Sequence, residues 1–507
     1  MAAAITAAVA AVLLLSGFQA SKTASDTIAI GTPFAPTTLD PQVGTSGGDY
    51  AYLYFLFDRL IQQDPLTGAL KPMLATSWSF VGKNKLAFDL NLRRGVKFQD
   101  GTPFNADAVI ATFKRQKAKG DVLNNLQFVK GYKKLSPYKV RILLSQQNAQ
   151  LPYGLADRAG MIFSPTALAK TGDKDFGNNP VGAGAYKFVS QKAGAEYVFT
   201  RFDGYWNNNA PTRKRRVKNI KYVVFKTDSA EVAAIRSGQI QVAAVLYPQN
   251  VADLRKESDL VTTVGPNTTF SMIYFNGKLK PFDDPRVRLA VNHALDRQAI
   301  MKAASEGLGT VWYQPVPPNT FGWTKGINPL WPRDIAKAKA LMAEAGYADG
   351  VDVECYTYPG LGFEITAPIV VQNFKEIGIN LKVVTGTPAQ VVPFYTQNLS
   401  PCYLSGWGGG PNPAVAYRGI LWSKSYYNAG KTNFGVDKQI EAIMRTYTPL
   451  AQQALYRSIN LGMKRAPGYA PLYANPSVTA YAKNVKGWVT SPFPLANPTY
   501  QGLYYAG

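Results

Sequence analysis

A short segment in the C-terminal part of the chain combines residue types that a small-molecule binding site needs. Trp407 precedes three glycines and then Pro411 and Asn412, and Arg418 lies nearby. Glycine lets a backbone approach a ligand closely, and arginine suits bidentate binding of carboxylate or phosphate. The segment therefore predicts binding through an aromatic face, backbone N–H groups and a cation. A core tryptophan and a solvated arginine are the alternative interpretations.

Patterns typical of catalysis are missing from the sequence. The single histidine, His293, falls in a predicted helix, and Cys355 and Cys402 lack the spacing of zinc ligands. There is no Ser-His-Asp set, GxSxG elbow or phosphate-binding loop. Gly182-Ala-Gly184 lacks the third glycine and the acid of a dinucleotide site. We therefore expect a protein that is not an enzyme, with no cofactor and no metal site. A hydrolase with two carboxylates is left open, because no motif excludes it.

The chain carries a formal net charge of +23, which bears on its partners rather than on its fold. Its basic residues are scattered, and Arg213-Lys-Arg-Arg216 is the one compact cluster. No basic helix interleaved with stacking aromatics is present, so we expect no nucleic-acid partner. An anionic ligand, or a basic isoelectric point with no role in binding, explains the charge better.

The N-terminal segment resembles an export signal. Ala2 to Leu15 is an uncharged, mostly apolar run that is too short to span a bilayer comfortably. We expect residues 1–25 to be a signal peptide cleaved between Ala20 and Ser25. Phe18 stands where a lipoprotein would carry its lipid-modified cysteine. The sequence thus predicts a periplasmic protein that is not a lipoprotein, in a compartment where a disulfide is chemically possible.

Four segments, in order along the chain, carry a resemblance to a known family. Each combines turn glycines, helix-capping residues and aromatic residues; in the first, Asn105 is expected to cap a helix. Together they resemble the large periplasmic solute-binding proteins of ABC importers, family 5, which bind peptides, nickel complexes and opines. The segments are RGVKFQDGTPFNAD (94–107), NPVGAGAYKFVSQKAGAEYVFTRFDGYWN (179–207), FNGKLKPFDDPRVRLAVNHALDR (275–297) and CYLSGWGGGPNP (402–413).

The resemblance implies an α/β fold: a two-lobed clamp of the type II periplasmic-binding-protein class, with an extra small α/β accessory domain. A chain of 507 residues is also too long for one core. After the signal peptide we expect lobe I in residues 26–55, 179–268 and 478–507. The accessory domain is expected in residues 56–178 and lobe II in residues 269–477.

The family resemblance also implies a function. The protein would capture a solute between its lobes, close around it and deliver it to the permease subunits of an ABC transporter in the inner membrane, acting as a monomer. In peptide-binding members, an Asp in the loop after the tryptophan holds the peptide's α-ammonium. Here Gly410 is the counterpart, and no acid occurs from Cys402 to Tyr417.

The missing acid argues against a peptide held by a free α-ammonium group. We still predict a peptide or peptide-like solute as the ligand, because peptides are the family's commonest ligands. A non-peptide anionic solute, such as an opine, sugar-phosphate or oligosaccharide, is the alternative, and a secreted hydrolase is a further one. The expected ligand contacts come from both lobes and the hinge. They are Thr45, Tyr50, Tyr247 and Phe270 from lobe I and the hinge, and Trp407, Gly409, Gly410, Asn412 and Arg418 from lobe II.

Overall fold

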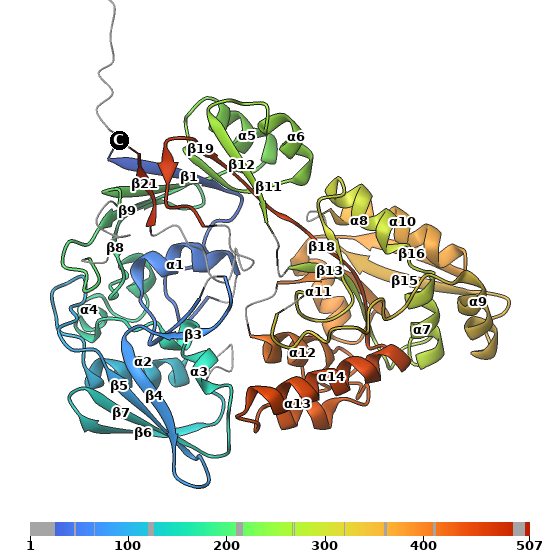
Figure 1. Ribbon diagram of the computed structural model, residues 1–507, viewed down its shortest axis with the longest axis horizontal. Coiled ribbons are helices and arrows are strands. Elements are labelled where there is room, and N and C mark those ends of the chain that lie inside the picture. The colour runs from blue at the N-terminus through green and yellow to red at the C-terminus, as the bar shows by residue number, and fades with distance from the viewer. Residues whose placement is uncertain are drawn as a thin grey trace, which may run out of the picture.

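The protein is described by a computed structural model, and three bodies can be distinguished in Figure 1. Lobe I and a small accessory domain lie on one side, and lobe II lies on the other. The structure describes residues 26–44, 47–64, 66–119, 126–208, 216–265, 267, 269–318, 320–358, 362–408, 412–489 and 502–506. The predicted signal peptide, Thr45, Gly409, Gly410 and Arg213 to Arg215 lie outside these residues.

Lobe I is built on a seven-stranded mixed sheet. Its central strand β1 is parallel to both of its neighbours, β10 and β11, and the outer strands are antiparallel to theirs. Strands from both ends of the chain thus share one sheet. In spatial order the strands are β12 (Leu260–Gly265), β19 (Ser477–Ala482), β11 (Val242–Leu246), β1 (Thr27–Thr32), β10 (Asn219–Val224), β9 (Glu196–Arg201) and β8 (Tyr186–Lys192).

Helices cover both faces of this sheet because β1 is apolar on both sides. Ile28 and Ile30 join the core under α1 (Tyr50–Leu56), whereas Ala29 joins the core under α5 (Asp228–Arg236) and α6 (Val251–Leu254). This alternation follows from the two-residue period of a strand. Val485 of β20 (Val485–Lys486) and Leu503, next to β21 (Tyr504–Tyr505), pack into the α1 side of the core.

The accessory domain is a four-stranded antiparallel sheet with short helices. In spatial order its strands are β4 (Ala75–Val81), β5 (Ala87–Leu92), β7 (Lys139–Leu144) and β6 (Val129–Ser136). The hairpin β2 (Ile61–Gln63) and β3 (Leu70–Pro72) precedes it. Asn105 caps α2 (Ala106–Ala118) by accepting the N–H groups of Asp107 and Ala108, which confirms the predicted cap. The helices α3 (Leu151–Gly154) and α4 (Pro165–Thr171) follow.

Lobe II has a six-stranded sheet between two layers of helices. Its strands, in spatial order, are β14 (Thr310–Val311), β18 (Tyr469–Ala474), β13 (Phe270–Phe275), β17 (Cys402–Trp407), β15 (Val351–Thr357) and β16 (Ile379–Thr385). One face packs against α7 (Pro285–Ala294), α8 (Arg297–Ser305), α9 (Ile335–Glu344) and α10 (Phe363–Lys375). The other face packs against α11 (Pro388–Thr396), α12 (Pro413–Leu421), α13 (Asp437–Ile443) and α14 (Pro449–Arg465).

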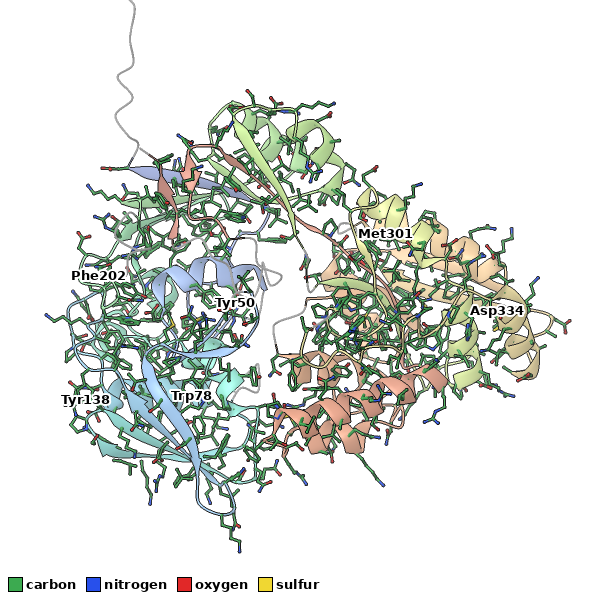
Figure 2. The ribbon with its side chains drawn as sticks, in the orientation of Figure 1. Tyr50, Trp78, Tyr138, Phe202, Met301 and Asp334 are labelled. Carbon is green, nitrogen blue, oxygen red and sulfur yellow. A yellow bond between two sulfur atoms is a disulfide. The ribbon has the colours of Figure 1, made fainter. Side chains whose placement is uncertain are left out.

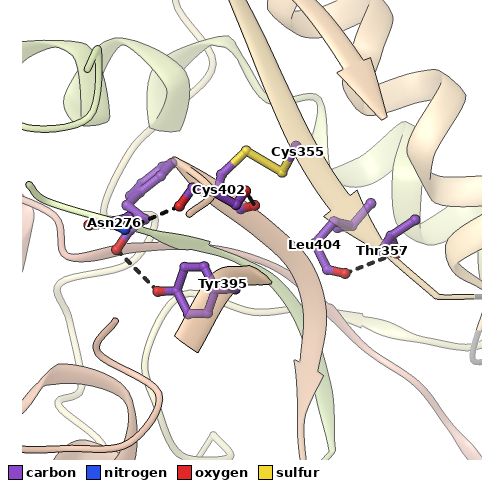
Figure 3. Close-up of a disulfide and its surroundings, with 8 residues drawn as sticks. Asn276, Cys355, Thr357, Tyr395, Cys402 and Leu404 are labelled. Atoms are coloured by element: carbon purple, nitrogen blue, oxygen red, sulfur yellow. Dashed lines mark hydrogen bonds between the residues drawn. A yellow bond between two sulfur atoms is a disulfide. The ribbon is translucent and has the colours of Figure 1, made fainter. Parts of the chain in front are cut away.

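The two cysteines form a disulfide within the lobe II sheet. Cys355 of β15 and Cys402 of β17 face each other in the register of two parallel strands, with their Cα atoms 4.9 Å apart (Figure 3). The Thr357 hydroxyl donates a 3.0 Å hydrogen bond to the backbone carbonyl of Leu404 and joins the same two strands further along. The Cys355–Cys402 disulfide, which the sequence indicated to be chemically possible, therefore cross-links two neighbouring strands.

The α/β fold with two lobes and an accessory domain is thus the fold that the family resemblance implied. The residue boundaries assigned to each domain stay predictions.

Candidate functional site

Two short chain segments connect lobe I with lobe II. One runs from Gly265 at the end of β12 to Phe270 at the start of β13, and the other joins Ala474 of β18 to Ser477 of β19. Gly265 pairs with Ser477 in the first sheet, and Phe270 pairs with Ala474 in the second. The two connections therefore lie side by side (Figure 1). Two adjacent crossings of this kind form a hinge about which lobes can close.

The carboxyl ends of the parallel strands in both sheets lie at this hinge. In lobe I, Leu246 ends β11 and pairs with Val478, just inside the start of β19. In lobe II, Trp407 ends β17 and pairs with Phe270, the first residue of β13. Ligands of open α/β sheets bind outside the carboxyl ends of the strands. The space between these two sheet edges is therefore the candidate binding site.

Trp407 is held at the edge of lobe II by a close contact with α12. A Cβ atom added to Gly419 of that helix would lie 2.0 Å from the Trp407 indole, so only glycine leaves room for the ring. Tyr427 meets the indole edge-on, with ring centroids 5.8 Å apart. The indole Nε1 is buried and has no hydrogen-bond partner among the described residues. A ligand acceptor placed there would remove the cost of that unpaired donor.

A cluster of tyrosine side chains packs beside Trp407. The ring of Tyr274 stacks on the rings of Tyr403 and Tyr427, with a centroid distance of 6.0 Å in each pair. The ring centroids of Tyr358 and Tyr403 are 6.2 Å apart. Burial raises the pKa of all four hydroxyls, so they stay protonated and can act as donors. Tyr274 and Tyr403 are buried, whereas Tyr427 is 37% exposed and Tyr358 is half-buried. Tyr427 and Tyr358 are therefore the tyrosines of this cluster that can meet both apolar and polar parts of a ligand.

Asn412 and Phe270 have structural roles at the same edge. Asn412 is the N-cap of α12, and its side chain accepts the N–H of Ala414 at 3.0 Å. Phe270 is fully buried, and its ring stacks on Trp312 at 5.5 Å with an interplanar angle of 10°. The ring of Phe270 therefore has no exposed surface to offer a ligand, in contrast to what we expected from its place at the hinge.

Tyr50 is fixed by a buried polar network on the lobe I side. Figure 2 shows Tyr50 on the part of lobe I that faces lobe II. Its hydroxyl donates a 2.5 Å hydrogen bond to Asp157, and the guanidinium of Arg158 lies 4.5 Å from its ring centroid. Arg158 also pairs with Asp49 at 3.0 Å, and both of those side chains are buried. Burial, followed by the Asp157 carboxylate, raises the pKa of Tyr50.

Tyr247 directly follows β11 and faces lobe II. Its ring is 44% exposed, and its backbone N–H donates to Asp228 at 3.0 Å. Partial burial, followed by the carboxylate of Glu364, raises the pKa of Tyr247. Glu364 belongs to the first turn of α10 in lobe II. Tyr247 therefore stands where the two lobes approach each other.

Arg418, on α12, contacts the accessory domain. Its guanidinium donates a 2.8 Å hydrogen bond to the side-chain oxygen of Gln127 and lies over the ring of Trp422, 4.4 Å from the centroid. Burial lowers the pKa of the guanidinium. The cation that the sequence suggested for an anionic ligand thus already joins lobe II to the accessory domain.

A known protein family matches most of the chain. The family described as "Bacterial extracellular solute-binding proteins, family 5 Middle" matches residues 69–429 of the chain. The chain belongs to this family.

Relatives of this family 5 protein match over nearly its whole length. Glutathione-binding protein GsiB of Salmonella choleraesuis (strain SC-B67) is 29% identical over 496 residues, which cover 94% of each chain. The periplasmic binding protein DppA of Helicobacter pylori, solved with the peptide STSA, gives a TM-score of 0.82 at 22% identity, covering 94% of this chain and 98% of that one. AgaA of A. tumefacien R10, solved with agropinic acid, gives 0.81 at 23% identity, covering 95% and 99%. These two structures share the fold of the family 5 protein.

The single histidine, His293, lies in α7 of lobe II. His293 is buried, its Nδ1 lies 2.7 Å from the carbonyl oxygen of Pro332, and burial lowers its pKa. Within the described part of the chain, no three His, Cys, Asp or Glu side chains are grouped to hold a metal ion. No helix in that part is long and apolar enough to cross a membrane.

The structure adds residues that the sequence did not single out. Asp157 and Arg158 support Tyr50 although Asp157 lies 107 residues away in sequence, and Asp49, next to Tyr50 in the chain, pairs with Arg158. Tyr427 packs beside Trp407, and Tyr274 stacks on Tyr427. The aromatic-rich strand FSMIYF could have pointed to Tyr274, but no sequence pattern links Arg158 to Tyr50. Such contacts depend on the topology.

Proposed function

We propose that this family 5 protein is the extracytoplasmic receptor of an ABC import system. It captures a peptide or peptide-like solute between its two lobes and delivers it to the membrane permease. The observation that carries this proposal is the meeting of two carboxyl-terminal sheet edges at a hinge of two adjacent connections. The names of its relatives support it, since GsiB is a glutathione-binding protein and DppA was solved with a peptide.

Closure of the two lobes would distinguish the ligand-bound receptor from the free receptor. A ligand shifts the open and closed populations only if it binds the closed state more tightly. Contacts from both lobes meet this requirement, because they are complete only when the lobes approach each other. The proposed contacts are Tyr50 and Tyr247 on one side and Trp407, Asn412 and Arg418 on the other, together with Thr45, Gly409 and Gly410, which lie outside the described residues.

A non-peptide anionic solute is the second candidate. No acid occurs from Cys402 to Tyr417 to hold a peptide α-ammonium, and the chain carries a net charge of +23. AgaA, which shares the fold, was solved with agropinic acid. These observations favour a ligand whose charge is negative rather than zwitterionic.

We further propose that the protein works as a periplasmic monomer, cleaved from its signal peptide and without a lipid anchor, and that it does not alter its ligand. The test is isothermal titration with panels of peptides, opines and sugar-phosphates, followed by chromatography of the recovered ligand. A binding protein returns the solute unchanged and is stabilised by it. Recovery of hydrolysis products would show an enzyme instead.

A further inference from the structure

A second recess lies between the accessory domain and lobe II. It has a volume of about 590 Å³, within the range of pockets that hold small ligands. Its accessory-domain wall comes from the β2–β3 turn, the end of β4 and α3. Its lobe II wall comes from the start of α14 and from Val316, Pro317, Thr320 and Phe321. Because each body supplies one wall, the recess is complete only when the accessory domain meets lobe II.

Aromatic rings line this recess from both bodies. Phe80 and Tyr153 line it from the accessory domain, and Phe321 and Tyr447 line it from lobe II. Phe80 and Tyr447 meet edge-to-face across the boundary, with centroids 4.8 Å apart. Rings that meet at this distance and angle form a favourable arrangement. The lining of the recess is therefore mainly apolar.

Lys85 gives the recess its charge. It is the one charged side chain among the described residues that line the space, and its Nζ lies 4.0 Å from the ring centroid of Tyr447. The remaining polar groups of the lining belong to threonine, tyrosine and glutamine side chains. A basic group that entered would meet a like charge in surroundings of low polarity, whereas an apolar group would not.

The recess adjoins the proposed ligand loop. Pro413 lines it and is the first residue of α12, immediately after the N-cap Asn412. Gly322 packs so closely against Pro413 that an added Cβ atom would lie 2.8 Å from it. The hydroxyl of Tyr417 donates a 3.0 Å hydrogen bond to the Gly322 carbonyl, which fixes this wall to α12. One helix start therefore serves both the ligand loop and the recess.

Backbone contact closes the boundary beside the recess. The N–H of Ala149, which lines the space, donates a 2.8 Å hydrogen bond to the Met444 carbonyl in lobe II. A group that fills the recess thus adds apolar burial between the same two bodies, so it would favour their approach.

Resting on the proposed function, we infer that this recess is a specificity pocket for a large apolar side chain of the captured solute. The ligand is then a peptide or peptide-like molecule with an aromatic or bulky aliphatic group, and a basic side chain at that position is rejected.

Calorimetry on the full chain tests the inference, with tripeptides that carry Ala, Phe or Lys at each position in turn. Peptides with one Phe at the correct position should bind about tenfold or more tightly than the Ala peptide, as expected for burying an aromatic side chain. Ala69→Trp fills the recess from an exposed position and should abolish that preference while the Ala peptide keeps its affinity. Ala195→Trp, on the exposed β8–β9 turn, is the matched control and should change neither affinity. Lys85→Gln should selectively improve binding of the Lys peptides.

The outcomes separate the two proposals. If the Ala peptide binds but Phe gives no advantage, or if the advantage survives Ala69→Trp, the pocket assignment is wrong and the receptor function stands. If no tripeptide binds to the wild-type protein while an opine or sugar-phosphate does, the peptide assignment fails and the inference fails with it.

Discussion

Arg418 of lobe II donates a 2.8 Å hydrogen bond to Gln127 of the accessory domain, across 291 residues of sequence. The bond joins two bodies that must separate if the clamp opens, and the half-buried guanidinium would then lose this acceptor. Arg418 was singled out from the sequence as a cation for an anionic ligand. In the structure Arg418 joins lobe II to the accessory domain, and we propose that this contact helps to hold the two bodies together when the clamp is closed.

Gln127→Ala should weaken ligand binding severalfold, mainly through faster release. A hydrogen bond to a charged group contributes about 1.5–3 kcal/mol, and part of that is recovered by water at a half-exposed site. Stopped-flow measurement of dissociation checks this, with Gln146→Ala, on the same side of the accessory domain, as the control. An unchanged dissociation rate in Gln127→Ala would show that the hydrogen bond between Arg418 and Gln127 does not slow ligand release.

Trp407→Phe should lower ligand affinity about tenfold without unfolding the protein. The substitution keeps an aromatic ring against Gly419 but removes the buried Nε1 donor, which a bound solute is expected to use. Trp331→Phe is the matched control, because the Trp331 indole donates to the Lys464 carbonyl inside lobe II. Titration calorimetry of both variants decides the point. Equal affinities in the two variants would show that Trp407 packs in the core and does not contact the ligand.

Glu231 should make the stability of lobe I fall as the pH rises. Burial in α5, helped by nearby Asp228, raises the pKa of this carboxyl from 4.5 to about 8. Between those two pH values the folded state holds a proton that the unfolded state has released. The contribution of Glu231 to the free energy of unfolding is therefore fully present below about pH 4.5 and is lost as the pH rises towards 8. Glu231→Gln should remove this part of the pH dependence, and Glu344→Gln on the exposed side of α9 should not. Urea unfolding at pH 5, 6.5 and 8 provides the measurement, and identical pH profiles in wild type and Glu231→Gln would contradict the assignment.

The Cys355–Cys402 bond should stabilise lobe II by about 2–4 kcal/mol, because it closes a long loop in the unfolded chain. Replacing both cysteines by alanine should lower the free energy of unfolding by that amount in non-reducing buffer. Dithiothreitol should lower the stability of the wild type and leave the double variant unchanged. Alkylation of the denatured wild-type protein without reduction should modify neither cysteine, and labelling of both would show that the bond does not form.

Local features of the fold were predictable from the sequence, because each depends on neighbouring residues. Asn105, which the sequence predicted as a helix cap, caps α2, and Asp284 caps α7 with Pro285 at its first position. Asp334 caps α9 by accepting the N–H of Lys337. The ordered family segments implied the two lobes and the accessory domain. The hinge was implied as well, although its two crossings became visible only through strand pairing.

The supporting contacts of the site were not predictable in the same way. The pairing of Tyr50 with Asp157 spans 107 residues, and that of Arg418 with Gln127 spans 291. Each depends on how three bodies pack, which no local pattern encodes. Phe270 shows the opposite case, since its place at the hinge was predictable but the stacking on Trp312 that buries its ring was not.

Native mass spectrometry of the protein, purified without denaturation from the periplasm of a bacterium grown on rich medium, tests the receptor function most directly. We predict a complex with one small molecule per chain. Mild unfolding should release this molecule intact, with the mass and fragmentation of a short peptide that has a large apolar side chain. A released opine or sugar-phosphate would contradict the peptide assignment. A chain that carries no ligand and then binds none of the peptide, opine or sugar panels would contradict the receptor function itself.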